Sequence, residues 1–240
     1  MLYIIGLGLN NEKDITVNGL EAVKKCDLVY LENYTSKLQV SVDKLEKLYN
    51  KKIILADREF VESNKVLENA KDKNIALLIT GDVFSATTHI QLILECRKLG
   101  IKYNVINNAS ILNAVGITGL ELYKFGKITS IPFDNENIKT PIEVLNDNLK
   151  LGLHTLFLLD LNPNKNKFMT INEAINYLIK NKIKNMKAVA CCALGSENEI
   201  IKYDSLENLQ KQKFNKFPQC LTIPGKLHFV EEEMLKWYTN

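Results

Sequence analysis

The chain has 240 residues, 46% of them hydrophobic and 25% charged, a composition typical of a soluble globular protein with one large or two modest domains. The 31 Lys and Arg residues against 28 Asp and Glu give a formal net charge of +3, which is too small to indicate a nucleic-acid partner. No stretch approaches the roughly 20 apolar residues of a membrane span and the start lacks a signal-peptide pattern, so we expect a cytoplasmic protein that binds no membrane.

The first half of the chain alternates between short apolar segments and segments with a helical period. Strands are predicted at residues 2–8, 27–33, 52–57, 74–82 and 101–107. Helices are predicted between them at residues 14–26, 42–49, 63–73 and 86–100. Ser63 is the expected N-cap of the third helix, and Gly100 is the expected stop of the fourth. Strict alternation of strand and helix predicts a parallel sheet covered on both faces.

The second half restarts with a glycine-interrupted helical segment at residues 110–120. Further strands are predicted at residues 127–133, 153–161, 187–195 and 218–225. Further helices are predicted at residues 140–152, 170–181, 205–214 and 229–238. Pro141 in the first turn and Gly152 at the end support the first of these helices. We therefore predict an α/β protein with two α/β domains, residues 1–108 and 109–240.

Unusual residues stand at the ends of four predicted strands, where ligands of open α/β sheets bind. These strand ends are residues 6–10, 79–82, 106–111 and 157–161. Gly6 and Gly8 allow a ligand to approach the backbone because they have no Cβ. The third glycine of a GxGxxG motif is missing, but Glu32 at the end of the second strand has the chemistry to bind a ribose hydroxyl. A dinucleotide-dependent oxidoreductase built on Gly6 and Gly8 is therefore one alternative.

Asp82 is the most informative polar residue, because it directly follows a buried strand. An acid there needs a partner or a solvated cleft, so Asp82 either binds a ligand or caps the next helix. Ser110 has the same two interpretations. His154 precedes an apolar strand and is more consistent with a structural role, whereas His228 at the start of a helix is compatible with either role.

The cysteines and histidines do not form a metal-binding pattern. The five cysteines are odd in number and lack CxxC spacing, which favours reduced, buried thiols over disulfides or a zinc site. The three histidines are dispersed along the chain. We expect no metal site.

Seven segments together resemble one enzyme family. They are MLYIIGLGLNNEKDITVNGLEAV, VYLENYTS, ADREFVE, LLITGDVFSATTH, NNASILNAVGITGLELYKFG, GLHTLFLLDL and PGKLHFVEEEML. Nearly end to end, the chain resembles the tetrapyrrole-methylase-like class of S-adenosylmethionine methyltransferases, and within it the diphthine synthases. The resemblance implies two α/β domains with the cofactor cleft between them. It implies N-methylation of a modified histidine on translation elongation factor 2 during diphthamide biosynthesis, by a homodimer.

The resemblance also implies the cofactor contacts. The donor would be S-adenosylmethionine, which leaves as S-adenosylhomocysteine. The residues that match the family motifs are Leu9, Asp82, Ser85, Ser110, Ile111, Leu159, Leu194 and Gln219. Methyl transfer from a sulfonium needs mainly alignment of donor and acceptor, so no residue is assigned as a catalytic base. Besides the oxidoreductase, a non-catalytic scaffold is the remaining alternative.

Overall fold

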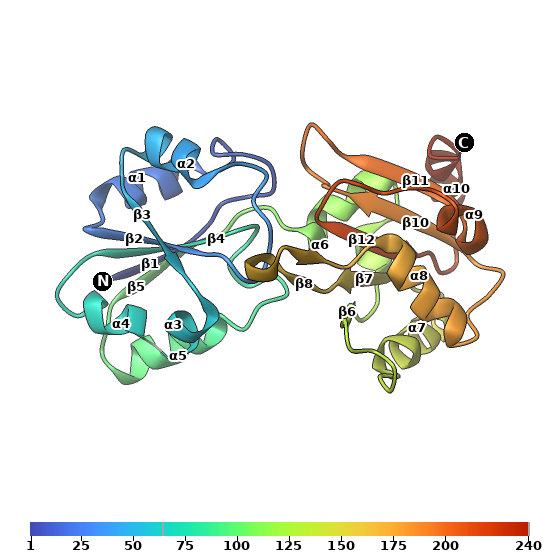
Figure 1. The fold of residues 1–240 in the computed structure, drawn as a ribbon, viewed down its shortest axis with the longest axis horizontal. Helices are drawn as coiled ribbons and strands as arrows, with labels where there is room; N and C mark the ends of the chain where they lie inside the picture. The colour runs from blue at the N-terminus through green and yellow to red at the C-terminus, as the bar shows by residue number, and fades with distance from the viewer. Residues whose placement is uncertain (64, 240) are drawn as a thin grey trace. The chain divides into compact units, whose positions relative to one another are not determined.

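The protein is described here by a computed structural model that covers residues 1–63 and 65–239, without the side chain of residue 164. The chain divides into two compact units (Figure 1). The first unit consists of Met1–Leu112 with Pro163–Lys165, and the second of Asn113–Asn162 with Asn166–Asn240.

The first unit contains the parallel sheet that the alternating pattern predicts. Its strands are β1 (Leu2–Gly6), β2 (Leu28–Glu32), β3 (Ile53–Ala56), β4 (Ile75–Ile79) and β5 (Tyr103–Ile106). They lie in the order β3-β2-β4-β1-β5, and every neighbouring pair is parallel. All carboxyl ends therefore lie at one edge of the sheet.

Helices cover both faces of this sheet, as Figure 1 shows. They are α1 (Val17–Lys25), α2 (Val42–Tyr49), α3 (Arg58–Glu62), α4 (Lys65–Ala70) and α5 (Ile90–Lys98). In β4, Ile75, Leu77 and Ile79 belong to the core under α3, α4 and α5. Ala76 and Leu78 belong to the core under α1 and α2. Side chains of a strand alternate between its faces, so a strand covered on both sides is apolar throughout.

The boundary between α3 and α4 corrects one expectation. Ser63 does not begin the helix predicted at 63–73; it is the C-cap of α3, and its N–H donates to Glu59 O at 2.9 Å. The five-residue α3 was not predicted, because its own N-cap Asp57 lies within the segment assigned to a strand. Gly100 ends α5 as predicted, with φ at +67°.

The second unit contains a mixed sheet. Its strands are β6 (Thr129–Ile131), β7 (Thr155–Leu159), β10 (Lys187–Cys192), β11 (Ile200–Ser205) and β12 (Gln219–Ile223). Their order is β11-β10-β12-β7-β6, and only β6 and β7 run parallel. A separate hairpin joins β8 (Leu161–Asn162) to β9 (Lys167–Phe168). Sequence patterns missed β11, which lacks a continuous apolar run, and the hairpin, whose strands are two residues long.

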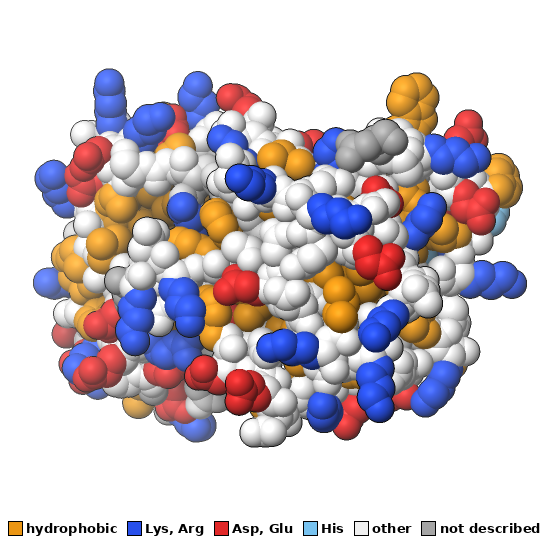
Figure 2. Space-filling view, turned by 45° about the vertical axis from the view of Figure 1, so that its right-hand side comes forward, with side chains coloured by type: hydrophobic (Ala, Val, Ile, Leu, Met, Phe, Trp, Pro, Cys, Tyr) orange, Lys and Arg blue, Asp and Glu red, His pale blue; other side chains and the backbone are white. Residues whose placement is uncertain are grey.

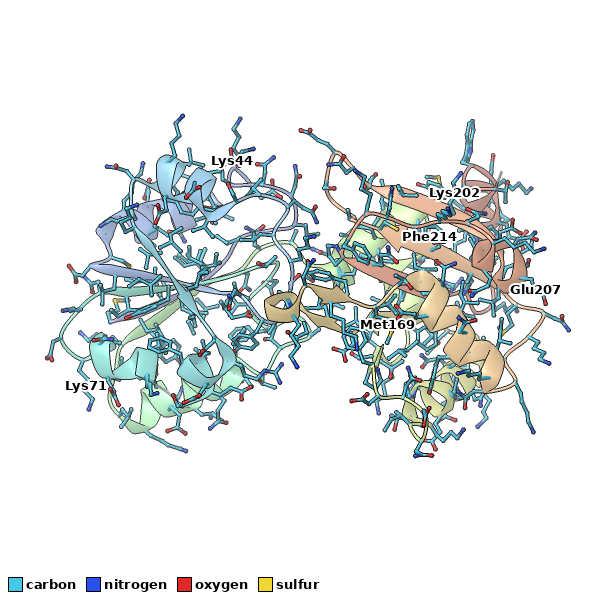
Figure 3. All side chains as sticks on the ribbon, viewed as in Figure 1. Lys44, Lys71, Met169, Lys202, Glu207 and Phe214 are labelled. Carbon is cyan, nitrogen blue, oxygen red and sulfur yellow. The ribbon has the colours of Figure 1, made fainter. Side chains whose placement is uncertain are left out.

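Helices connect the strands of this unit, and the core of the unit contains residues of the helices at 140–150, 171–180 and 206–210. The helices are α6 (Ile111–Ala114), which contains the boundary between the units, α7 (Thr140–Lys150), α8 (Ile171–Lys180), α9 (Leu206–Gln210) and α10 (Phe229–Lys236). Short 3-10 helices are η1 (Val115–Thr118) and η2 (Leu122–Lys124), whereas the 3-10 helix η3 (Pro163–Lys165) belongs to the first unit. Met169 and Phe214, labelled in Figure 3, are buried in the core with Phe157. In the part of the chain that the structure describes, no helix combines the length and apolar character that crossing a membrane requires.

Candidate functional site

Two glycine turns are joined at the carboxyl edge of the first sheet. Gly81 N donates to Gly8 O at 2.8 Å, and Gly8 N donates to Gly81 O at 3.2 Å. The backbone φ angles are +78° at Gly8 and +83° at Gly81, a conformation that residues with a Cβ adopt only at a cost. These hydrogen bonds fix the loop after β1 against the loop after β4.

Asn108 connects a third loop to the same place. Its Nδ2 donates to Gly6 O and to Asp14 O, both at 3.0 Å. A Cβ on Gly6 would lie 2.7 Å from Gly81 O and 2.9 Å from Asn108 Cβ, so only glycine fits. Asn108 lies in one of the unusual strand ends, at residues 106–111, but it was not among the predicted site residues. Its signal was the pair of asparagines directly after β5.

Asp82 is held by both carboxylate oxygens. Oδ1 accepts hydrogen bonds from Phe84 N at 3.0 Å and Ser85 Oγ at 3.1 Å, and Oδ2 accepts from Asn108 N at 3.1 Å. Burial raises the pKa of Asp82, but these hydrogen bonds outweigh that effect and lower the pKa below its ordinary value. The α5 helix begins only at Ile90, so Asp82 does not cap it. Asp82 instead connects the loops after β4 and β5.

The other predicted residues of the first unit belong to the same loops. A Cβ on Gly81 would lie 3.9 Å from Leu9 Cδ2 and 3.8 Å from Ala109 O, which places Leu9 beside the Gly81 turn. Ser110 is buried, and its Oγ accepts a hydrogen bond from Leu112 N at 3.2 Å, as a helix-capping serine does. Ile111 is the first residue of α6. The first unit thus brings its five predicted residues to the loops after β1, β4 and β5.

The three predicted residues of the second unit also lie near one sheet edge. Leu159 ends β7, and Gln219 begins the antiparallel neighbour β12. Leu194 follows β10, whose loop is fixed to the start of β12 by a hydrogen bond from Ala193 N to Pro218 O at 2.8 Å. All three side chains are buried.

The side chain of Gln219 makes hydrogen bonds within the second unit. Its Oε1 accepts from Ile171 N at 2.7 Å, and its Nε2 donates to Phe214 O at 3.1 Å and Lys216 O at 2.9 Å. This amide therefore positions the loop before β12 against the start of α8. Its role as a cofactor contact stays a prediction.

The residues of the first unit fit an adenosyl sulfonium. The space beside Gly81, which a Cβ would fill, is bordered by the apolar Leu9 and by backbone. Asp82, a carboxylate with a lowered pKa, directly follows Gly81 in the chain. Apolar walls with a few placed polar groups are typical of sites for small molecules.

Glu32 does not support the dinucleotide alternative. The side chain is buried, and Oε1 accepts hydrogen bonds from Tyr34 N at 2.8 Å and Thr35 N at 2.6 Å. Oε2 accepts from the Thr35 hydroxyl. The carboxylate therefore stabilises the turn after β2 and is engaged within the protein.

The two histidines of the second unit have local roles. His154 is buried and hydrogen-bonded to Glu231, which agrees with the structural role favoured by the sequence. His228 is the N-cap residue of α10, and its N–H donates to Glu231 Oε2 at 2.7 Å.

Comparisons with known proteins connect this geometry to a family. The family model of tetrapyrrole (corrin/porphyrin) methylases matches residues 1–210. A diphthine synthase of Methanococcus maripaludis is 45% identical, with 99% of this chain and 98% of that protein covered. A "probable diphthine methyl ester synthase" of Arabidopsis thaliana is 43% identical, with 99% and 98% covered. A crystal structure of a diphthine synthase superposes with a TM-score of 0.93 at 40% identity, with 99% of this chain and 95% of that one covered.

Proposed function

The chain belongs to the tetrapyrrole (corrin/porphyrin) methylase family and is a methyltransferase, and we propose that it is the diphthine synthase of its cell. In this proposal it N-methylates the modified histidine of translation elongation factor 2 during diphthamide biosynthesis. The observation that carries the proposal is the likeness to diphthine synthases over nearly the whole of both chains. The oxidoreductase alternative has no such support.

The proposed methyl donor is S-adenosylmethionine, with S-adenosylhomocysteine as product. We assign its contacts in the first unit to Leu9, Asp82, Ser85, Ser110 and Ile111. We assign its contacts in the second unit to Leu159, Leu194 and Gln219. The assignment is supported by the joined glycine turns and by the carboxylate of Asp82, which is suited to a positively charged ligand.

The donor is activated by its own sulfonium charge, so the protein contributes alignment and exclusion of water. In the proposed reaction the acceptor nitrogen forms a bond to the methyl carbon while the carbon–sulfur bond breaks toward sulfur. The mutual hydrogen bonds of Gly8 and Gly81 keep the loops beside the donor in one conformation. Asp82 holds the adjacent loop through Asn108 N.

The proposed acceptor is a folded protein that functions in translation, so we also propose a cytoplasmic location. Basic and acidic side chains are interspersed on the face shown in Figure 2, which favours recognition of a particular docking surface over attraction by net charge alone. One relative carries the name "probable diphthine methyl ester synthase", so the assay below distinguishes an ester from N-methylation.

We further propose a homodimer, as the resemblance implies. Trp237 stands at the end of α10 with 81% of its surface exposed, and it is the chain's one tryptophan. Light scattering during size-exclusion chromatography gives the molar mass directly. A mass of one chain contradicts the dimer and leaves the proposed chemistry intact.

Two measurements test the function. Calorimetric titration should detect binding of S-adenosylmethionine and S-adenosylhomocysteine, with no binding of NAD. Incubation with labelled donor should incorporate methyl groups into elongation factor 2 that carries the unmethylated precursor. Mass spectrometry of the modified histidine then counts the methyl groups and distinguishes N-methylation from an ester. Absence of incorporation in the presence of a bound donor would contradict the proposal and favour the scaffold.

A further inference from the structure

A cavity of about 300 Å³ opens in the first unit, beside the loop between β4 and α5. Its buried lining comes from the loop after β2, from α3 and from the start of α5. The buried lining residues are Tyr34, Val61, His89 and Leu92. Glu62 stands at the exposed rim, with a side chain 54% accessible. The other lining residues, Thr88 and Gln91, are exposed, so the cavity has a buried floor that includes one histidine and a polar rim with one acidic group.

The hydrogen bonds of His89 determine which nitrogen of its neutral ring carries the lone pair. Its Nδ1 lies 3.1 Å from Val83 O, and since a carbonyl only accepts hydrogen bonds, Nδ1 carries the hydrogen. In the neutral ring the lone pair is therefore on Nε2. This nitrogen lies 3.9 Å from Glu32 Oε2, beyond hydrogen-bond distance but close enough to stabilise a positive charge on the ring.

The charges around the cavity favour a cationic ligand. Glu32 and Glu62 are acidic, and the Arg58 guanidinium lies 3.8 Å from Glu62 Oε1 and 5.2 Å from the centroid of Tyr34. Two carboxylates and one guanidinium leave a net charge of −1 while His89 is neutral. Asp57, the N-cap of α3, adds a further negative charge nearby. Burial and the neighbouring carboxylates raise the pKa of Tyr34, so its ring keeps a neutral phenol.

One loop connects the cavity to the candidate donor site of the same unit. Asp82 and Ser85 belong to the donor contacts proposed above, and His89 ends the same loop. Val83, between them, accepts hydrogen bonds from His89 Nδ1 and from Thr87 Oγ1, the latter at 2.9 Å. The loop that contacts the donor therefore also fixes the orientation of the His89 ring.

We propose that this cavity receives the amine-bearing end of the acceptor side chain and that His89 Nε2 accepts the amine's proton. The proposal rests on the proposed function. In this proposal the acceptor ammonium displaces the Arg58 guanidinium from Glu62 at the mouth and from the face of the Tyr34 ring. Glu32 stabilises the imidazolium. His89 is in this sense a catalytic residue, and Glu32 is a positioning residue.

The steps balance in atoms and charge. The acceptor ammonium gives one proton to His89 Nε2 and becomes a neutral amine. Its lone pair then forms the nitrogen–carbon bond while the carbon–sulfur bond breaks, so that the sulfur keeps the electron pair. His89 releases its proton to solvent before the next cycle. A second or third methylation repeats the sequence, because each methylated nitrogen that still carries hydrogen has a proton to lose.

Glu62→Gln tests the binding part, with Glu59→Gln as its matched control. Glu59 lies on the same helix and its side chain is 84% accessible, but it does not line the cavity. The expected result is a KM for elongation factor 2 raised about tenfold or more by Glu62→Gln, and an unchanged KM for Glu59→Gln. The dissociation constant of S-adenosylmethionine stays unchanged in both. Equal KM values in the two variants would overturn the binding part.

His89→Asn tests the proton transfer. Asparagine keeps an N–H donor in the place of Nδ1 and removes the atom equivalent to Nε2. The expected result is a kcat lowered about 100-fold or more, with the dissociation constant of S-adenosylmethionine unchanged. Donor affinity and the urea midpoint report whether the variant is folded, and Glu62→Gln provides an independent test from an exposed position. A kcat like that of the wild type would overturn this role. Wild-type protein that transfers no methyl group would overturn both the inference and the proposed function.

Discussion

His154 Nε2 lies 2.8 Å from Glu231 Oε1, and neither side chain is accessible to solvent. Gly225 N donates to His154 Nδ1 at 2.9 Å, so the ring carries its hydrogen on Nε2 and donates it to the carboxylate. Glu231 also accepts from Glu121 N at 2.9 Å and His228 N at 2.7 Å. One buried carboxylate thereby joins the start of α10 to the segments before β7 and η2.

Replacing Glu231 should therefore destabilise the second unit. The Lys124 ammonium also donates to this carboxylate, and Glu231→Gln leaves that cation with Glu121 alone, whose Oε2 lies 3.7 Å away. We expect a loss of about 3 kcal/mol in the free energy of unfolding, measured by urea titration. Glu232→Gln is the control, because Glu232 is the exposed neighbour on the same helix. Equal midpoints for the two variants would contradict a structural role of Glu231.

The pair of Glu231 and His154 also predicts that the protein loses stability at low pH. Burial raises the pKa of Glu231, but hydrogen bonds from Glu121, Lys124 and His228 outweigh it and lower the pKa from 4.5 to about 2. The stability that the ionised Glu231 carboxylate contributes is fully present above about pH 4.5 and disappears as the pH falls toward about 2. Burial also lowers the pKa of His154 below 6.5, so the unfolded chain takes up a proton first as the pH falls below that value.

Glu231 and His154 therefore both make the folded state less stable as the pH falls. The difference in urea midpoint between wild type and Glu231→Gln should be largest near neutral pH and should narrow below about pH 4.5. A difference that stays constant with pH would show that the carboxylate's charge contributes nothing.

Asp82→Ala should weaken donor binding about tenfold or more, because a hydrogen-bonded charged group contributes roughly 1.5–3 kcal/mol. In the structure this carboxylate holds Phe84 N, Ser85 Oγ and Asn108 N, so its loss releases two loops at once. Calorimetric titration with S-adenosylmethionine measures the effect. Asp72→Ala, at an exposed acid of the same unit, is the control. An unchanged dissociation constant would limit Asp82 to shaping its own turn.

Gly81→Ala separates backbone strain from loss of binding space. Gly81 and Gly100 both have positive φ, so alanine at either position costs roughly 1–2 kcal/mol of stability. A Cβ at Gly100 meets nothing within 4 Å, whereas a Cβ at Gly81 enters the space beside Leu9. We expect similar losses of stability and a loss of donor affinity only for Gly81→Ala. Equal donor affinities would place the donor away from this turn.

Much of the first unit's architecture is predictable from neighbouring residues. The apolar run of β4 and the helical period of α2 depend on side chains a few positions apart, and both elements lie within their predicted ranges. Strand β11, with the sequence IIKYDS, has no continuous apolar run and gives no comparable signal. It exists because its backbone pairs with β10, from Lys187 opposite Ser205 to Cys192 opposite Ile200.

The sequence by itself determined that Gly6, Gly8 and Asp82 stand at strand ends, since apolar periodicity and glycine chemistry are local properties. Only the tertiary structure decided what these residues do. The hydrogen bond between Asn108 N and Asp82 Oδ2 joins positions 26 residues apart, and Gly6 must lack a side chain because Asn108 packs against it. Such contacts depend on the order in which parallel strands lie beside one another, and a linear pattern of residues does not contain that order.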